Sequence, residues 1–378
     1  MNQRHVAGLG IVVCGFCGWA WAGQEFLVAG GGGEQSRPAI SGTIVVWQEK
    51  SQYSGDWNVK GADLRSPSSP SLFTVANDDL GDERNPAIWG RTVVFEYESA
   101  LLDQDLIMMA DITRLDQPEV FVIADTSQGT NNYPVVCGDL IAWQDYVGGD
   151  WDIRAIQRKG SGGAGIRLPM SWDDEGFAAI DGTLLLWERR SQGSNFIVGC
   201  DALDPNATAI PLFSQDVNQW YPAISGRWAV CATDRQIEAD NLADPYISIP
   251  ISEPLADAMT RPAICQNVVV WAQKQGGQWH IVGYNLAKKA RFQVTSHAGD
   301  QIQPAVSFSP DLKAYLVVWA DNRNGNWDIY GRVLDSADQV GGCATPLKGD
   351  VNEDCIVDAF DVAEVQSRLG QVNGVPAN

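Results

Sequence analysis

The side chains whose spacing most clearly predicts chemistry lie near the carboxyl end of the 378-residue chain. In the stretch GDVNEDCIVDAFD, acidic and amide side chains occupy positions 1, 3, 5, 9 and 12 of a twelve-residue loop; they are Asp350, Asn352, Asp354, Asp358 and Asp361. Hard oxygen ligands at alternating positions suit calcium. We therefore expect this loop to bind Ca²⁺.

Elsewhere the residues that could do chemistry form no comparable pattern. Carboxylates gather in predicted loops without singling out a pair that could act on a sugar; they include Asp78, Asp79, Asp82, Glu83, Asp173, Asp174 and Glu175. After the leader described below, the chain has only His280 and His297, too few for a three-histidine zinc site. We assign no catalytic residue.

The elements that position these residues come from a repeat of roughly 45 residues. Seven segments share one plan, as in RPAISGTIVVW from Arg37, YPVVCGDLIAW from Tyr133 and YPAISGRWAVC from Tyr221. Each contains one anchor residue, and the seven anchors are Trp47, Phe95, Trp143, Trp187, Cys231, Trp271 and Trp319. A polar turn follows, then a strand that usually begins with Trp, then a short apolar strand.

Units of four strands that repeat in this way predict an all-β fold, a propeller of seven four-stranded blades, with six blades as the alternative. Apolar runs such as residues 44–47 do not alternate, so they should be buried on both faces. The seventh unit stops after its third strand, whereas EFLVAGGGG from Glu25 contains a fourth strand, residues 26–29, with no unit before it. Pairing that strand with residues 328–333 would close the ring and remove an exposed sheet edge.

The segment ADNRNGNWDIYGRVL, residues 320–334, resembles the TolB-like family of propeller repeats, a WD40-like group. The resemblance covers roughly residues 24–335. It implies architecture rather than activity, because propellers carry many functions.

In a propeller, the loops between strands four and one and between strands two and three lie on one face, here named the top face. These loops mix carboxylates, amides and aromatic residues, which suits a neutral sugar or a peptide better than an anion. Most tryptophans recur at blade spacing and should pack in the core or between blades. Trp89, Trp172 and Trp220 break the repeat, and we expect them to bind ligand.

The first 22 residues have a charged start, an apolar run and small residues at Ala20 and Ala22, which predicts a cleaved secretory signal. The mature protein should then lie outside the cytoplasm, secreted, periplasmic or at the cell surface, with no membrane span. The formal net charge of −21 repels phosphate backbones and argues against nucleic acid as a partner. We divide the chain into signal 1–22, propeller 23–335, linker 336–348 and tail module 349–378.

The tail, from residue 341 to 370, resembles one repeat of a type I dockerin, an EF-hand-like calcium module that docks secreted proteins onto cohesins. The resemblance implies side-chain ligands at Asp350, Asn352, Asp354 and Asp361, the Ile356 carbonyl, and Asp358 directly or through water. A short helix should follow the loop. The chain carries one such repeat where a dockerin has two, and Cys355 stands where the loop normally has glycine.

A cysteine at that position strains the loop by about 1 kcal/mol. We expect a disulfide between Cys355 and Cys343, twelve residues upstream, to offset this strain by about 2 to 3 kcal/mol. Cys137 and Cys265 share one repeat position and should not pair, while Cys200 and Cys231 lie in adjacent blades and their state stays open.

These features favour a secreted, non-catalytic propeller that binds a carbohydrate or peptide on its top face and attaches to a cohesin-like or cell-surface partner through a calcium-stabilised tail. Dockerins imply a polysaccharide-degrading context. The alternatives are a propeller glycoside hydrolase or polysaccharide lyase with the same tail, and a TolB-like platform for protein interactions at the envelope.

Overall fold

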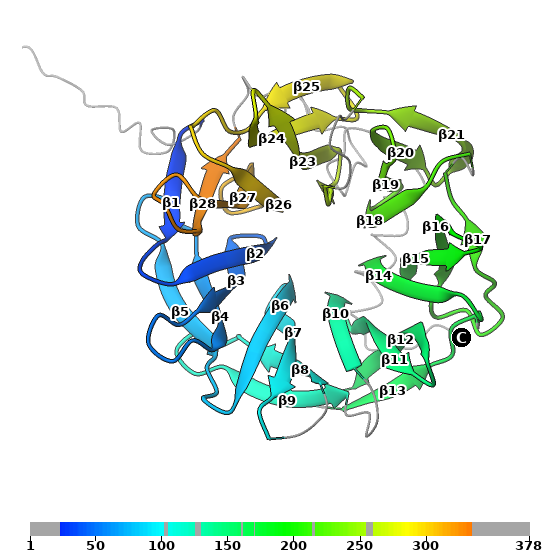
Figure 1. Ribbon diagram of the computed structural model, residues 1–378, viewed down its shortest axis with the longest axis horizontal. Coiled ribbons are helices and arrows are strands. Elements are labelled where there is room, and N and C mark those ends of the chain that lie inside the picture. Colours follow the sequence, from blue (N-terminus) through cyan, green and yellow to red (C-terminus); the bar gives the residue numbers. More distant parts are fainter. Residues whose placement is uncertain are drawn as a thin grey trace, which may run out of the picture.

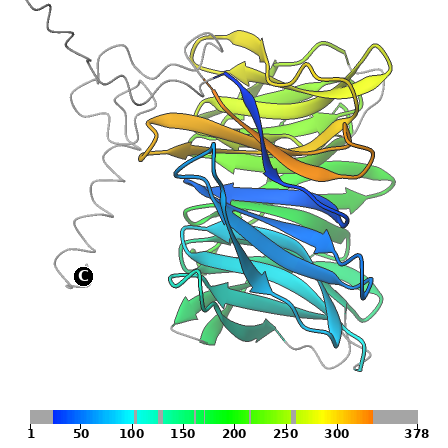
Figure 2. The same cartoon turned by 90° about the vertical axis from the view of Figure 1, so that its left-hand side faces the viewer.

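The computed structural model describes residues 23–334, except for 102–104, 125–129, 160–161, 170, 214–215 and 255–259. In this part of the chain, seven four-stranded antiparallel sheets surround a central opening (Figure 1). From the side, the strands run across the thickness of the ring (Figure 2). The seven-bladed fold is confirmed and the six-bladed alternative is excluded. The predicted signal and tail lie outside the described residues.

Each of blades one to six takes four consecutive strands. Blades one to three contain β2 (Glu34–Ser41), β3 (Ile44–Lys50), β4 (Trp57–Asp63), β5 (Ser71–Ala76), β6 (Gly81–Trp89), β7 (Thr92–Ser99), β8 (Asp105–Asp111), β9 (Glu119–Ala124), β10 (Thr130–Cys137), β11 (Leu140–Val147), β12 (Asp150–Lys159) and β13 (Gly162–Ile166). Blades four to six contain β14 (Asp174–Asp181), β15 (Leu184–Ser191), β16 (Ser194–Asp201), β17 (Ile210–Pro211), β18 (Gln219–Ser225), β19 (Trp228–Thr233), β20 (Ile237–Asn241), β21 (Asp244–Pro250), β22 (Ala263–Cys265), β23 (Val268–Gln275), β24 (Gln278–Asn285) and β25 (Ala290–Gln293). Blade seven combines β26 (Gln301–Ser309), β27 (Ala314–Asp321), β28 (Asp328–Val333) and β1 (Glu25–Ala29).

The hydrophobic core lies between neighbouring blades. The second strand of each blade is buried on both faces, as its unbroken apolar run predicts, and the anchors Trp187 and Trp319 are fully buried. Trp271 of blade six packs with Val230 of blade five, for example. Each blade therefore depends on both neighbours to cover its faces.

The first strand of each blade lines the opening (Figure 1), and in most blades it carries a bulge. The bulged residue has a φ of about 50° in six blades; the six residues are Arg37, Asn85, Tyr133, Phe177, Tyr221 and Gln303. A left-handed backbone costs roughly 1 kcal/mol or more for a residue with a Cβ. The bulge also turns this backbone N–H away from its own sheet, where it needs another acceptor.

A side chain of the preceding blade supplies that acceptor. Gln48, directly after the anchor of blade one, accepts a hydrogen bond from the N–H of Asn85 in blade two, at 3.0 Å. Glu188 of blade four accepts one from Tyr221 of blade five, at 2.7 Å. Similar bonds join three more pairs of blades, and they form a ring of contacts near the top face.

A second ring of hydrogen bonds lies at the opposite face, in the turns between strands one and two. Ser41 accepts a bond from the N–H of Gly90 in the next blade, and Cys137 accepts one from Gly182 at 3.2 Å. Cys137 and Cys265 thus occupy a place that serine takes in other blades, and no disulfide involves Cys137, Cys200, Cys231 or Cys265. The described residues therefore hold these four cysteines as free thiols.

The first strand closes the ring as the sequence predicts. Glu25 of β1 stands opposite Arg332 of β28 in an antiparallel pair. A Cβ added at Gly331 would come within 2.9 Å of the Phe26 ring, and Gly61 has the same relation to Phe73 inside blade one. Strand β1 therefore completes blade seven in the way that β5 completes blade one.

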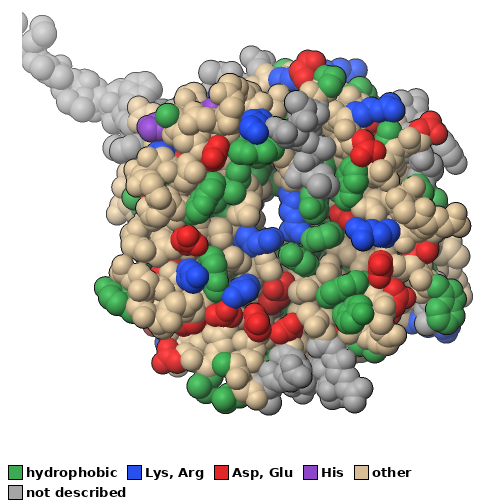
Figure 3. Space-filling model, in the orientation of Figure 1, with side chains coloured by type: hydrophobic (Ala, Val, Ile, Leu, Met, Phe, Trp, Pro, Cys, Tyr) green, Lys and Arg blue, Asp and Glu red, His purple; other side chains and the backbone are tan. Residues whose placement is uncertain are grey.

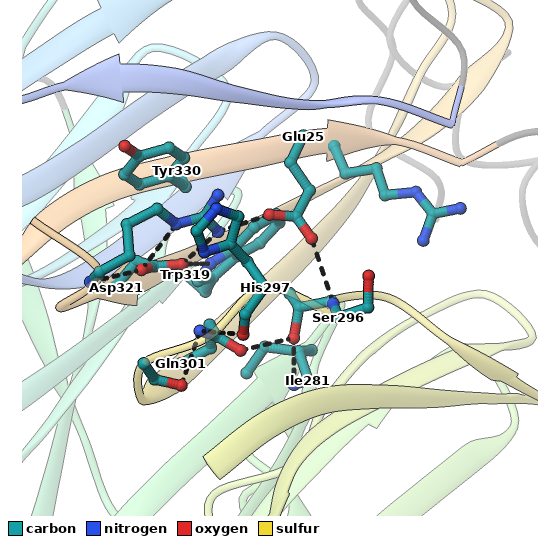
Figure 4. Close-up of polar contacts among 12 residues, drawn as sticks. Glu25, Ile281, Ser296, His297, Gln301, Trp319, Asp321 and Tyr330 are labelled. Carbon is teal, nitrogen blue, oxygen red and sulfur yellow. Dashed lines mark hydrogen bonds and ion pairs between the residues drawn. The ribbon is translucent and has the colours of Figure 1, made fainter. Parts of the chain in front are cut away.

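A buried ion-pair network secures this closure. Arg323 of blade seven binds both Glu25 and the fully buried Asp321, and its guanidinium lies 4.1 Å from the centre of the Tyr330 ring (Figure 4). Asp321 also accepts a hydrogen bond from the Trp319 indole, at 2.9 Å. The network connects the closing strand to the anchor of the last blade.

Candidate functional site

A polar pocket of about 390 Å³ opens between blades one, two and three. Its walls come from the bulged residues, the side chains after two anchors, and the strand ends near the top face. The lining residues are Arg37, Gln48, Trp57, Asp82, Arg84, Asn85, Glu96, Glu98, Asp105, Asn132 and Tyr133. Two aromatic rings thus share one pocket with both donors and acceptors of hydrogen bonds.

Trp57 is the aromatic wall on the side of blade one. Its ring lies 5.6 Å from the Arg84 guanidinium and 5.9 Å from the Lys50 ammonium, within the range of cation–π attraction. Its backbone N–H donates to Asp82 Oδ1 at 2.8 Å, and Asp82 in turn pairs with Arg84. These contacts hold the indole and the guanidinium in place beside each other.

Glu96 forms the floor on the side of blade two. Its carboxylate accepts hydrogen bonds from the Tyr133 N–H at 2.5 Å and from Asn85 Nδ2 at 2.6 Å. Burial raises the pKa of Glu96 above its ordinary value, while these two bonds and the nearby Arg37 act in the opposite direction. Glu96 is therefore a structural acceptor that also faces the pocket.

Three polar atoms of the lining residues are buried without a hydrogen-bond partner among the described residues: Arg84 Nε, Asn85 Oδ1 and Asn132 Oδ1. Buried polar atoms are nearly always paired in folded proteins, with protein, water or ligand. Each of these atoms has almost no accessible surface, so a water or a ligand group could reach it only after a shift of the pocket walls.

A second cluster stands at the axis of the ring, beside this pocket. The Arg261 guanidinium lies 5.1 Å, 4.7 Å and 4.9 Å from the ring centres of Tyr133, Phe177 and Tyr221, which come from three different blades. Arg37 lies 5.6 Å from the Tyr133 ring. Lys and Arg side chains border the central opening in the space-filling view (Figure 3). We call Arg37, Arg261 and these three rings the axial cluster.

The first strand of blade six, next to Arg261, differs from the first strands of the other blades. This strand, β22, is only three residues long, and Arg261 precedes it. Blade five has Ala232 after its anchor, where blades one and four have glutamine or glutamate, so this junction lacks the usual side-chain acceptor. Arg261 is surrounded by protein yet stays exposed to the solvent of the channel; desolvation and the nearby Arg37 lower its pKa from the ordinary value.

The three tryptophans selected from the sequence do not meet at one place. Trp172 precedes β14 on the top face and is 98% exposed. Trp220 lies at the start of β18, half-buried and also near the top face. Trp89 ends β6 at the turn into β7, which lies at the opposite face, so it cannot contact a ligand held by the other two.

Other predicted sites meet the structure as follows. The calcium ligands, Cys343 and Cys355 fall outside the described residues. Within the part that the structure describes, no group of three or more His, Cys, Asp or Glu is placed to hold a metal, and no helix could cross a membrane. Among the loop carboxylates, Glu83 is buried, which raises its pKa to about 8, and it accepts a bond from the Asp78 N–H.

Sequence reasoning missed Trp57, Tyr133, Arg37 and Arg261. The sequence did carry a signal for Arg37, Tyr133 and Arg261, each of which is the first residue of its repeat. This first residue varies among arginine, asparagine, tyrosine, phenylalanine and glutamine, whereas the proline and alanine that follow it recur in most repeats. A variable residue in the innermost strand faces the channel rather than the core.

A scan against known protein families finds no match, and no curated protein matches the chain either. Solved structures do resemble it. The propeller domain of the Trilobed protease from Pyrococcus furiosus, which has an open velcro topology, is 10% identical with a TM-score of 0.58, over 79% of this chain and 95% of that one. Oligogalacturonate lyase from Vibrio parahaemolyticus is 11% identical with a TM-score of 0.56, over 85% and 97%.

TolB from Acinetobacter baumannii also matches, at 15% identity and a TM-score of 0.49, over 72% of this chain. This chain spans 65% of the TolB chain, slightly less than two thirds. At such identities, the likeness concerns the propeller fold alone. The two structures above share the propeller architecture with this chain.

Proposed function

We propose that the protein is a non-catalytic propeller that binds a saccharide in the pocket between blades one, two and three. The observation that carries this proposal is the combination of the Trp57 ring with the guanidinium of Arg84, the amide of Asn132 and the carboxylate of Glu98 in the lining of one pocket. A sugar ring presents an apolar face for stacking and hydroxyls that both donate and accept. Pockets that fix a ligand with a few polar groups and an aromatic wall suit such a molecule.

Isothermal titration calorimetry with a panel of oligosaccharides tests this function directly. W57A should weaken binding about tenfold or more, because it removes the stacking surface. The matched control is W151A, since Trp151 holds the same place in the repeat, one residue into the third strand of blade three, but does not line the pocket. Equal effects of W57A and W151A, or no binding of any saccharide, would refute the proposal.

A second candidate function is glycoside hydrolysis or polysaccharide cleavage at the same pocket. Four carboxylates line it, at Asp82, Glu96, Glu98 and Asp105, and burial raises the pKa of Glu96, as suits a general acid. Release of reducing ends from any bound saccharide, abolished by E96Q, would favour the enzyme over the binding protein. A third candidate, a protein-interaction platform, would show protein binding without saccharide binding.

For the tail, we propose a calcium-bound, dockerin-like module that attaches the protein to a cohesin-like or cell-surface partner outside the cytoplasm. The support is the spacing of its oxygen ligands: side chains at Asp350, Asn352, Asp354 and Asp361, the carbonyl of Ile356, and Asp358 directly or through water. Calorimetry on the full chain should show one Ca²⁺ site that is lost in the D350A/D361A variant. Calcium binding that persists in this variant would refute the assignment.

A further inference from the structure

The two arginines of the axial cluster make no ion pair at contact distance with a described residue, although Arg37 lies near Glu96 and Arg261 near Glu188. Among the described residues, neither the Arg37 nor the Arg261 guanidinium forms an ion pair or a hydrogen bond, whereas Arg84 and Arg323 each bind carboxylates. The whole chain has a formal charge of −21, so carboxylates are abundant. Burial raises the pKa of both neighbouring carboxylates, Glu96 and Glu188, and neither contacts a guanidinium, so the two arginines near the Tyr133 ring form a site with positive charge in an acidic protein.

The packing of Arg261 leaves its hydrogen-bond donors available. A guanidinium is planar, and its N–H groups all point outward in that plane. The three aromatic rings lie within about 5 Å of the group, and among the described residues its N–H groups make no hydrogen bond to the hydroxyls of Tyr133 or Tyr221. The planar fork of donors matches a carboxylate, which it can bind with two parallel hydrogen bonds.

The axial cluster is continuous with the saccharide pocket. Arg37 and Tyr133 line that pocket, and both belong to the cluster. A molecule bound against Trp57 and Asn132 can therefore extend toward the axis and reach the arginines without leaving the protein surface. The acidic side of the pocket, with Asp82 and Glu98, disfavours a ligand that carries negative charge at that end.

We propose that Arg37 and Arg261 form an anion site that selects saccharides bearing a carboxylate, that is, oligosaccharides containing a uronic acid. This inference rests on the proposed saccharide binding at the adjoining pocket and names its ligand class. The uncharged hydroxyls of the sugar face the acidic and amide side chains, and the carboxylate faces the axis. The axial arginines thus reverse the expectation, drawn from the loops alone, that the top face suits a neutral sugar better than an anion.

The test compares matched acidic and neutral oligosaccharides on the full chain by calorimetry. Trimers of glucuronic or galacturonic acid differ from the corresponding glucose and galactose trimers only at C6, where a carboxylate replaces a hydroxymethyl group. We expect the acidic trimer to bind about tenfold or more tightly than its neutral counterpart, with a preference that falls as salt increases. R261Q and R37Q should each abolish the preference.

Two further variants keep the test specific. R114Q removes a surface arginine whose one ion pair among the described residues is with the exposed Asp116, so it controls for general electrostatics and should leave the preference unchanged. R261K keeps the charge but loses the planar fork, so an intermediate preference is expected. Because Arg261 packs against three rings, thermal unfolding must confirm that R261Q folds, and R37Q provides an independent result if it does not.

The outcomes separate the two proposals. Equal binding of acidic and neutral trimers overturns the anion site and leaves saccharide binding intact. Failure of every saccharide to bind overturns both, as does binding only of peptides with a free carboxyl terminus. An acidic preference that survives in both R261Q and R37Q also overturns the assignment of the carboxylate to these arginines.

Discussion

Arg323 in the last blade donates a hydrogen bond to Glu25 in the first strand, across 298 residues of sequence. The pair joins the two ends of the described chain inside one sheet. Its arginine side chain is only 9% exposed, and Asp321, its other partner, is fully buried. Closure of the ring therefore rests on a charged network as well as on the β1 and β28 backbone pairing.

Removal of Arg323 should destabilise the fold strongly. R323A leaves the buried Asp321 carboxylate without its cation, which costs about 3 to 5 kcal/mol in the free energy of unfolding. Chemical denaturation measures the loss. As a control, R114A breaks an exposed pair with Asp116 and should change stability by less than about 1 kcal/mol. Similar losses in both variants would contradict the role assigned to the network.

Glu188 should make stability depend on pH. Burial raises its pKa to about 7, so from about pH 4.5 to 7 the folded state holds a proton that the unfolded state has released. Stability from this group is full below pH 4.5 and is lost as the pH rises through 7, by up to about 3 kcal/mol. E188Q keeps an acceptor for Tyr221 and should reduce this fall, measured by denaturation at pH 4.5 and 8.

The same repeat position offers a reciprocal control. Gln144 of blade three accepts the bond from Phe177 that Glu188 accepts from Tyr221. Q144E should therefore add a loss of stability at high pH that the wild type lacks. Because Glu83 and Glu96 also have raised pKa values, E188Q reduces the dependence without removing it. An unchanged pH profile in both variants would refute this account.

The tryptophans differ in their predicted effect on ligand binding. Trp89 lies at the opposite face from the pocket, so W89A should leave saccharide affinity unchanged. Trp172 is fully exposed on the top face and does not line the pocket. W172A should therefore weaken the binding only of ligands long enough to extend beyond the pocket. Calorimetry with short and long oligosaccharides measures both, and a large effect of W89A would place the site elsewhere.

Thiol labelling should show which cysteines react. Burial raises the pKa of Cys137, Cys200 and Cys265 to about 11, and that of Cys231 well above its ordinary value. Thiolate is the reactive form, so these four should resist iodoacetamide at pH 8 in the folded protein.

The two tail cysteines supply the contrast. If Cys343 and Cys355 form the proposed disulfide, they label only after mild reduction, and mass spectrometry then finds the label at these two sites and at no other. Labelling of the tail cysteines without reductant would refute the disulfide. Rapid labelling of Cys137 in the folded state would show that burial does not protect it.

The blades could be predicted from the sequence because the anchors and turns recur. The pairing of β1 with β28 could also be predicted, because only the seventh unit lacked a fourth strand. The pocket could not be predicted from the sequence. Trp57 holds the same place in the repeat as Trp151, and the two differ only in the side chains that surround them in space. The axial cluster depends on a backbone bulge that directs Arg37 and Tyr133 inward. A strand pattern predicts burial but not such a local change of φ.

The closing pair also determines how the propeller responds to force. Strand β1 begins beside the end of β28, where the Gly23 N–H donates to the Val333 carbonyl at 2.9 Å. Tension between these two ends would break the hydrogen bonds of the pair one after another, as a zipper opens, rather than shear them all together. Blade seven would therefore peel open first, at low force, while the six blades with internal hairpins stay intact.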